Sequence, residues 1–462
     1  MTMTFATLVF LPLAVWAAFR TSRTVAVLAA SVGFSGSAVF NIPALQFGFQ
    51  PYHLFGTLLV VRALLDARVR RTERKRRRIT WVLYALGGFW FVAFMGVATA
   101  EPVEADRFYM VSQLIHLGFG ISVTWALSRV VRTPETLRAA CRGLERGAVF
   151  IAAWAIMQFT LNGLGREYPA FLFNNSIGEY SSLSGHAFGV AGLIRAGSVA
   201  TEPSFLGRSL VIALAVLMVR NARGSAPQRR WMVGAALVIA IGLLMATSST
   251  GLFGLAILLG VGLVSGRKLR IHRLAIFVAT AGALVPVVSP ALADGLVEAT
   301  IGKSDTFSYQ GRLLSMQIGR ELFWEHQWLG VGWGNLTVHD LPYKVLSNTG
   351  IAGAVCLLVV LFGLLVGRVR PEHAGTLRPV LRGLKLAVAM SVAMDWVAGF
   401  SYAYGDLWVI SGLLLAAMTL GPDSLPQPPA AKPSPVDRPL PATEPVRAHV
   451  PSQESAAVTA QR

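Results

Sequence analysis

The chain has 462 residues, of which 54% are hydrophobic and 14% are charged. Soluble domains carry about 25% charged residues, so the composition argues against an ordinary soluble domain and favours a chain embedded in lipid. The formal net charge of +18 would suit a nucleic-acid-binding protein. Its distribution along the chain is instead typical of membrane topology, so we expect no nucleic-acid partner.

Continuous apolar runs of about 15 to 22 residues recur along the chain, close to the length with which a helix crosses a ~30 Å hydrocarbon core. The runs do not alternate with polar residues, which excludes a transmembrane strand barrel. We expect spans at 4–19, 24–45, 51–66, 79–99, 109–128, 147–163, 203–219, 231–247, 251–265, 274–293, 346–367, 384–401 and 404–420. The predicted fold is an all-α membrane protein, a polytopic helical bundle of about 12–13 transmembrane helices within residues 1–420.

Basic residues are distributed unevenly between alternate connections of this bundle. If the Arg-rich segment 67–78 is cytoplasmic, the connections on its side hold 28 Lys and Arg, and those on the other side hold eight. Cytoplasmic loops carry such an excess. The long connections at about 164–202 and 294–345 are then external. The tail at 421–462 is predicted to be cytoplasmic and, being rich in Pro, disordered.

The second long connection combines a predicted helix with residues suited to phosphate and proton chemistry. Its segment 311–326 has apolar residues every four positions, which predicts an amphipathic helix. Arg312 and Arg320 on this helix present planar cations that bind phosphate oxygens in pairs. His339, which follows the helix, titrates near neutral pH and can act as a base or orient a hydroxyl.

Polar residues outside the second long connection give weaker indications of function. Asp395 lies within a predicted span, where a carboxylate is costly, so we expect it to be functional or paired with an inward-facing arginine. Glu104 and Asp106 form a lone acidic pair, and no Cys or His spacing resembles a zinc site. We therefore predict no metal and no cofactor.

Several elements of the C-terminal half occur in a characteristic order. Arg312 opens the predicted helix and Trp324 follows on it. The element LGVGWGN, residues 329–335, comes next, then His339, and then the Gly-x-x-Gly at 350–353. In these elements the chain resembles the O-antigen ligase and O-antigen polymerase superfamily, whose pattern includes P/W-x-G-x-G-x-G-N followed by a His.

The first long connection also resembles the family's pattern. Arg195, in the segment RAGSVATEPSFLG, resembles the family's first external Arg, and the following Glu202-Pro203-Ser204 resembles the polymerase-type variant. A structural interpretation of Glu202 is also open, because an acidic residue ahead of Pro203 suits the start of a helix. The chain departs from the family at 248–251, where Ser-Ser-Thr-Gly stands in place of a frequent Ser-Arg.

The resemblance implies a metal-independent membrane glycosyltransferase that uses a polyprenyl-diphosphate-linked glycan donor and a glycan acceptor. It also implies a multi-pass protein of the bacterial cytoplasmic membrane, with its catalytic loops periplasmic, surrounded by membrane lipids and accompanied by chain-length regulator or export proteins. The implied catalytic residues are Arg195, Arg312 and His339. The implied substrate-binding residues are Glu202, Arg320, Gly332, Gly334, Asn335 and Tyr343.

Four interpretations of function remain open at this point. The first is a polysaccharide polymerase that moves a growing lipid-linked chain onto a lipid-linked repeat unit. The second is a ligase that moves the finished glycan to a lipid A core or another acceptor. A transporter or flippase would place ionisable residues along a path through the spans, and the spans contain few of them. The fourth is a structural subunit of a glycan-export complex.

Overall fold

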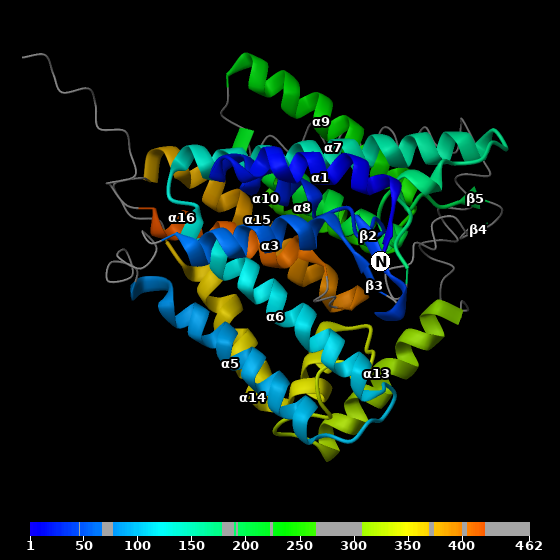
Figure 1. The fold of residues 1–462 in the computed structure, drawn as a ribbon, viewed down its shortest axis with the longest axis vertical. Helices are drawn as coiled ribbons and strands as arrows, with labels where there is room; N and C mark the ends of the chain where they lie inside the picture. Colours follow the sequence, from blue (N-terminus) through cyan, green and yellow to red (C-terminus); the bar gives the residue numbers. More distant parts are fainter. Residues whose placement is uncertain are drawn as a thin grey trace, which may run out of the picture. The chain divides into compact units, whose positions relative to one another are not determined.

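The computed structural model describes residues 1–45, 47–66, 77–177, 189–190, 193–221, 225–264, 307–368, 374–399 and 404–420. Of these described residues, 77% are helical. Its α-helices are α1 (Phe5–Ala18), α2 (Thr21–Ser31), α3 (Pro51–Leu65), α5 (Arg77–Thr99), α6 (Arg107–Val130), α7 (Pro134–Gly163), α8 (Pro203–Asn221), α9 (Ala226–Ala246), α10 (Ser249–Val264), α13 (Phe307–Glu325), α14 (Leu341–Val366), α15 (Ala374–Ala398) and α16 (Gly405–Thr419). Figure 1 shows their arrangement.

The predicted all-α membrane class is confirmed. Among the described residues, six segments are long and apolar enough to cross a membrane, and they lie in α5, α6, α7, α8, α9 and α14. Four shorter apolar helices, α1, α3, α10 and α16, coincide with four more predicted spans. The chain is therefore a multi-pass helical membrane protein. The predicted span at 274–293 and the C-terminal tail lie outside the described residues.

The predicted span at 24–45 is wrong. Helix α2 ends at Ser31, and the chain then turns into a small antiparallel sheet of β1 (Thr2–Met3), β2 (Phe40–Ile42) and β3 (Phe47–Phe49), in which Phe40 pairs with Phe49. The turn lies close to the segment that precedes α8, and Gly36 N–H donates to the Val199 carbonyl over 2.9 Å. A Cβ on Gly36 would lie only 2.8 Å from the Ala200 oxygen.

Helix α7 is longer than the predicted span at 147–163. It begins after Thr133, whose hydroxyl accepts a hydrogen bond from the Thr136 N–H, and its first half packs on α2. Gly143 and Gly147 make this approach possible, since a Cβ at either position would overlap the backbone of α2. Small residues four apart on one face are a common device for close packing of membrane helices.

Helix α8 occupies a central position, because it packs on α7, α9, α10 and α15. In its membrane-length segment 83% of the residues are buried. Helix α13, the predicted amphipathic helix, packs on α14 through Met316, Ile318 and Leu322, which meet Val331, Val338 and Tyr343. The loop that precedes α14 is thereby held against α13.

Helix α14 is broken at Gly350, which has φ 61° and ψ −166°. The amides just after the break find their acceptors in the preceding loop: Ile351 N–H donates to the Gln327 carbonyl and Ala352 N–H to the Trp328 carbonyl. A Cβ at Gly350 would overlap the Trp328 carbonyl. Glycine is thus required here both by the positive φ and by the close approach of the loop.

Candidate functional site

A cavity of about 320 Å³ lies where α8, α10, α13, the loop before α14 and the end of α15 meet. Three of the residues predicted from the sequence line it: Glu202, Arg312 and His339. Its remaining lining residues are Ser204, Phe205, Arg208, Thr250, Gly311, Asp395, Ala398 and Gly399. Segments from both long connections therefore converge on one cavity that also reaches two charged residues of the spans.

Arg195 lies beside this cavity, within electrostatic range of both Glu202 and Arg312. Partial burial lowers the pKa of Arg195, the Glu202 carboxylate raises it, and the positive charge of Arg312 lowers it again. The Arg195 Nε is buried and has no hydrogen-bond partner among the described residues. Two guanidinium groups from distant parts of the chain thus lie close enough to repel each other, with one carboxylate near them.

The backbone around Arg195 is fixed by the helices behind it. Ala196 N–H donates to the Met245 carbonyl at the end of α9 over 3.1 Å. Ser198 lies in the left-handed region at φ 55°. Its N–H donates to Gln158 Oε1 and its hydroxyl donates to the Ile151 carbonyl, each over 2.7 Å. Both acceptors belong to α7, so Arg195 is presented by a rigidly anchored segment.

Glu202 stands at the start of α8, as its position ahead of Pro203 predicts. Its carbonyl accepts the Leu206 N–H over 3.1 Å, and its carboxylate accepts the Ser204 hydroxyl over 3.0 Å. The carboxylate therefore both lines the cavity and faces the Arg195 cation. This geometry fits the structural interpretation of Glu202, and its contact with substrate stays a prediction.

Arg312 and His339 are connected through Ser315. The Ser315 hydroxyl donates to the Arg312 carbonyl over 2.9 Å, and the His339 N–H donates to the Ser315 Oγ over 3.4 Å. Gly319 allows α13 to lie this close to the loop, because a Cβ there would lie 3.0 Å from the Val338 side chain. Within the described residues no carboxylate forms an ion pair with Arg312.

His339 combines solvent access with a lowered pKa. Partial burial lowers the pKa of its imidazole, and the positive charges of Arg312 and Lys344 lower it further. The imidazole is therefore neutral at neutral pH, with a ring nitrogen able to accept a proton. Gly399, at φ +82°, lies against the His339 backbone, where a Cβ would be 3.0 Å from the His339 Cα. A glycine at the end of α15 is needed for His339 to occupy this place.

The glycine-rich element 329–335 does not reach the cavity. Gly332 and Gly334, both at positive φ, pack against α5 and α6, where an added Cβ would lie 2.8 Å from the Met110 Cε and 2.7 Å from the Gln113 Cβ respectively. The fully buried Asn335 side chain donates to the Glu101 and Val331 carbonyls, each over 2.8 Å. The structure gives this element a packing role, and its contact with substrate stays a prediction.

Arg320 and Tyr343 also lie outside the residues that line the cavity. Arg320 is exposed on α13, two turns beyond Arg312. Tyr343 is partly buried beneath α13 and donates its N–H to the Asp340 carboxylate, which caps α14. A direct contact of either residue with substrate likewise stays a prediction.

Arg208 belongs to this site although it was not among the site residues predicted from the sequence. It lies in the second turn of α8, is 3% exposed, and forms an ion pair with Asp395 on α15, with 2.5 Å between Nη1 and Oδ1. Its Nη2 donates to the Ser391 hydroxyl over 2.8 Å. The available signal was the carboxylate of Asp395 within a span, which needs an inward-facing cation.

The acidic pair noted in the sequence has protein partners. Asp106 accepts the Tyr109 N–H over 2.7 Å and so caps α6, while Glu104 accepts the Thr337 N–H over 3.3 Å. Within the described residues, no three His, Cys, Asp or Glu side chains gather in a group that would hold a metal ion.

Comparison of the chain with protein-family models finds no match, and comparison with curated protein sequences finds none either. The class of the protein therefore rests on its own helices. Their length and hydropathy make it a multi-pass membrane protein. In it, Arg312 and His339 line one cavity, and Arg195 lies within electrostatic range of Arg312.

Proposed function

We propose that the protein is a polysaccharide polymerase, a membrane glycosyltransferase that moves a polyprenyl-diphosphate-linked glycan chain onto a lipid-linked repeat unit at the external face of the membrane. The observation that carries this proposal is the approach of Arg195 and Arg312 to each other beside a cavity that His339 and Glu202 line. The resemblance to O-antigen polymerases supplies the substrate class. The basic-residue distribution supplies the predicted side of the membrane.

The electrostatics of the cavity support an anionic ligand. Two guanidinium groups that repel each other are stabilised when an anion lies between them, and the planar donors of arginine suit phosphate oxygens. Glu202 offsets part of this charge, and Arg208 is already neutralised by Asp395. A diphosphate that departs from a sugar gains negative charge, so cations placed in advance lower the barrier to its departure.

The neutral His339 supports activation of the acceptor. In the proposed step, the acceptor hydroxyl oxygen attacks the anomeric carbon of the donor sugar, and the bond between that carbon and the diphosphate oxygen breaks. The bonding electrons leave with the polyprenyl diphosphate, beside Arg195 and Arg312. The hydroxyl proton passes to the His339 imidazole, which later releases it to water.

Substitution of the three residues at matched membrane abundance tests this proposal. In cells, alanine at Arg195, Arg312 or His339 should reduce long glycans and leave lipid-linked single repeat units. Arg166→Ala is the matched control, because this residue is exposed on the same predicted external side and is absent from the cavity lining. Unchanged long glycan in all three variants would remove the assignment.

The same glycan profile separates the polymerase from the ligase. Loss of a polymerase leaves single units, whereas loss of a ligase leaves full-length glycan that has not been attached to its acceptor. Accumulation of full-length lipid-linked chains in the Arg312→Ala strain would therefore favour the ligase assignment over the polymerase assignment. The proposed chemistry of the site would be unchanged.

A further inference from the structure

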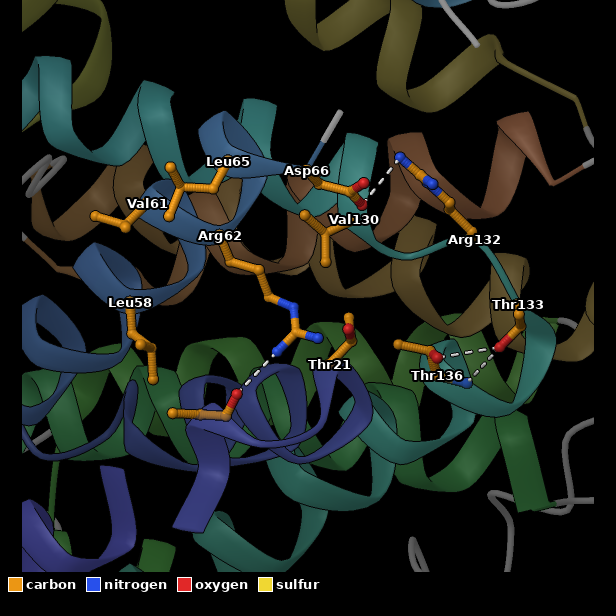
Figure 2. Close-up of a pocket in the computed structure, with 11 residues that line it drawn as sticks. Thr21, Leu58, Val61, Arg62, Leu65, Asp66, Val130, Arg132, Thr133 and Thr136 are labelled. Carbon is orange, nitrogen blue, oxygen red and sulfur yellow. Dashed lines mark hydrogen bonds and ion pairs between the residues drawn. The ribbon is translucent and has the colours of Figure 1, made fainter. Parts of the chain in front are cut away.

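A second and larger cavity, of about 620 Å³, lies where the end of α3 meets the α1–α2 turn and the α6–α7 turn (Figure 2). It shares no lining residue with the cavity of Arg312 and His339. The segment that follows α3 is the Arg-rich stretch 67–78, which the charge distribution predicts to be cytoplasmic. This cavity therefore belongs to the side of the bundle where the basic residues gather.

Two arginines give the cavity a cationic end. The Arg62 Nη1 donates to the Ala18 carbonyl at the end of α1 over 3.0 Å, and Figure 2 shows the guanidinium reaching towards α1 from α3. The Arg132 Nη2 lies 3.3 Å from the Asp66 carboxylate, and both side chains remain about 30% exposed. Asp66 offsets one of the two positive charges, so the lining keeps a net positive charge.

Neither guanidinium is saturated by these contacts. A guanidinium offers five N–H donors. The contacts within the described residues use one nitrogen of Arg62, while Arg132 uses its Nε for the Arg129 carbonyl and its Nη2 for Asp66. The remaining nitrogens can bind the oxygens of an anion, and planar donor pairs suit a phosphate group.

The other side of the cavity is apolar and open. Val61 and Leu65 line it from α3, and they are 45% and 78% exposed. Leu64, next to them on the same helix, is 60% exposed. In a membrane protein such side chains face acyl chains, so the cavity offers cations at one end and a hydrocarbon surface at the other. Such a cavity suits an amphiphilic ligand with an anionic headgroup.

We propose that this cavity binds the phosphate headgroup of an anionic phospholipid, with Arg62 and Arg132 on the phosphate and an acyl chain along Val61 and Leu65. Basic pockets between helix ends on the cytoplasmic side are a recurrent form of anionic-lipid site. Asp66 holds Arg132 and competes with the phosphate for it. The site is independent of glycosyl transfer and stands even if that proposal fails.

Lipid binding to the purified full-length protein tests the proposal. Native mass spectrometry in detergent would compare phosphatidylglycerol with phosphatidylcholine of the same acyl chains, and phosphatidylglycerol should bind more tightly. Arg62→Gln and Arg132→Gln should each weaken phosphatidylglycerol binding about fivefold. Arg138→Gln is the matched control, since this residue of α7 pairs with Glu135 outside the cavity and its loss should leave the affinity unchanged.

The expected effect of Asp66→Asn is one that a purely structural role of Asp66 would not explain. It removes the competing carboxylate and should strengthen phosphatidylglycerol binding, and this gain remains measurable if an arginine variant fails to fold. Glycerol 1-phosphate, which has the phosphate but no acyl chain, should not displace the lipid at equal concentration. Equal binding of the two phospholipids, unchanged binding by both arginine variants, or displacement by glycerol 1-phosphate would each overturn the proposal.

Discussion

Arg208 on α8 and Asp395 on α15 form a buried ion pair, with their nearest nitrogen and oxygen 2.5 Å apart and both side chains at most 4% exposed. Both residues of the pair line the cavity that Arg312 and His339 also line. A carboxylate in a membrane span is costly without a partner. The two residues therefore join the two helices that pack most extensively around the site, and they leave the cavity charge to Arg195, Arg312 and Glu202.

Asp395→Ala should destabilise the protein, because it leaves the Arg208 guanidinium buried without its counterion. Removal of one partner of a buried pair costs about 3–5 kcal/mol. The double variant Arg208→Met with Asp395→Leu should recover part of this loss, since it removes both charges of the pair but leaves the buried Asp406 carboxylate without the nearby Arg208 cation. Unfolding of the purified protein in detergent measures the effect, and a stable Asp395→Ala single variant would contradict it.

Arg195 and Arg312 should each tolerate lysine better than alanine in a reconstituted transfer reaction. Loss of one donor that stabilises a developing anion lowers the rate about 100- to 1,000-fold. Lysine keeps the charge but loses the planar donor pair, so its rate should fall between those of the wild type and alanine. Initial rates of chain elongation in proteoliposomes measure this order, and equal rates for lysine and alanine would mean that charge is not what these residues supply.

The acid limb of the pH profile should report on His339. Burial and the neighbouring cations lower the pKa of His339, so the imidazole stays neutral, and the activity stays level, down to a pH below its ordinary value of about 6.5. Lys344→Gln removes one of these cations, raises the pKa and should move the acid limb to higher pH. Lys344→Arg keeps the charge and should leave the limb in place; a shift in the arginine variant would point to a packing effect.

Gly399→Ala should displace His339 and lower transfer activity. The position has φ +82°, and the added methyl group would lie 3.0 Å from the His339 Cα. A non-glycine residue in a strained conformation costs about 1–3 kcal/mol. Gly234→Ala on α9 is the control, because nothing lies within 4 Å of its added Cβ. Activity and unfolding of the two variants would be compared, and full activity of Gly399→Ala would contradict the geometry.

Cysteine labelling should establish the predicted orientation. In a variant without Cys141 and Cys356, Gln310→Cys should react with a membrane-impermeant maleimide in intact cells, because position 310 belongs to the predicted external connection and is exposed. Lys75→Cys, in the Arg-rich segment, should react only after permeabilisation. The reverse pattern would place the cavity of Arg312 on the cytoplasmic side and remove its access to an externally presented donor.

Hydropathy predicted the helices of the bundle well and their ends poorly. The predicted span at 24–45 failed because the chain turns after Ser31, and Gly36 in this turn bonds to Val199, some 160 residues away. A local hydropathy window cannot contain this contact. Helix α7 extends further than its apolar run. Its polar residue Glu145 is buried there because it forms a bidentate ion pair with Arg220 of α8. In both cases contacts with distant segments, and not the local composition, determine where the helix ends.

The cavity was predictable only in part. Arg195, Glu202, Arg312 and His339 were expected to act together because of the resemblance to a family, since spacing along the chain carries no information on distances between loops. The glycine-rich element was expected to approach a ligand, whereas its glycines approach α5 and α6. A positive φ and a close contact produce the same glycine pattern whether the neighbour is a ligand or a helix.

The break at Gly350 determines how the connection that precedes α14 can be exchanged between related proteins. The amides of Ile351 and Ala352 bond to carbonyls of the loop, so the first turns of the membrane-spanning part of α14 and the segment carrying His339 form a single folding unit. A chimaera joined at Leu341, where the helix formally starts, would cut through that unit. The junction has to lie beyond Gly353, after the amides that bond to the loop.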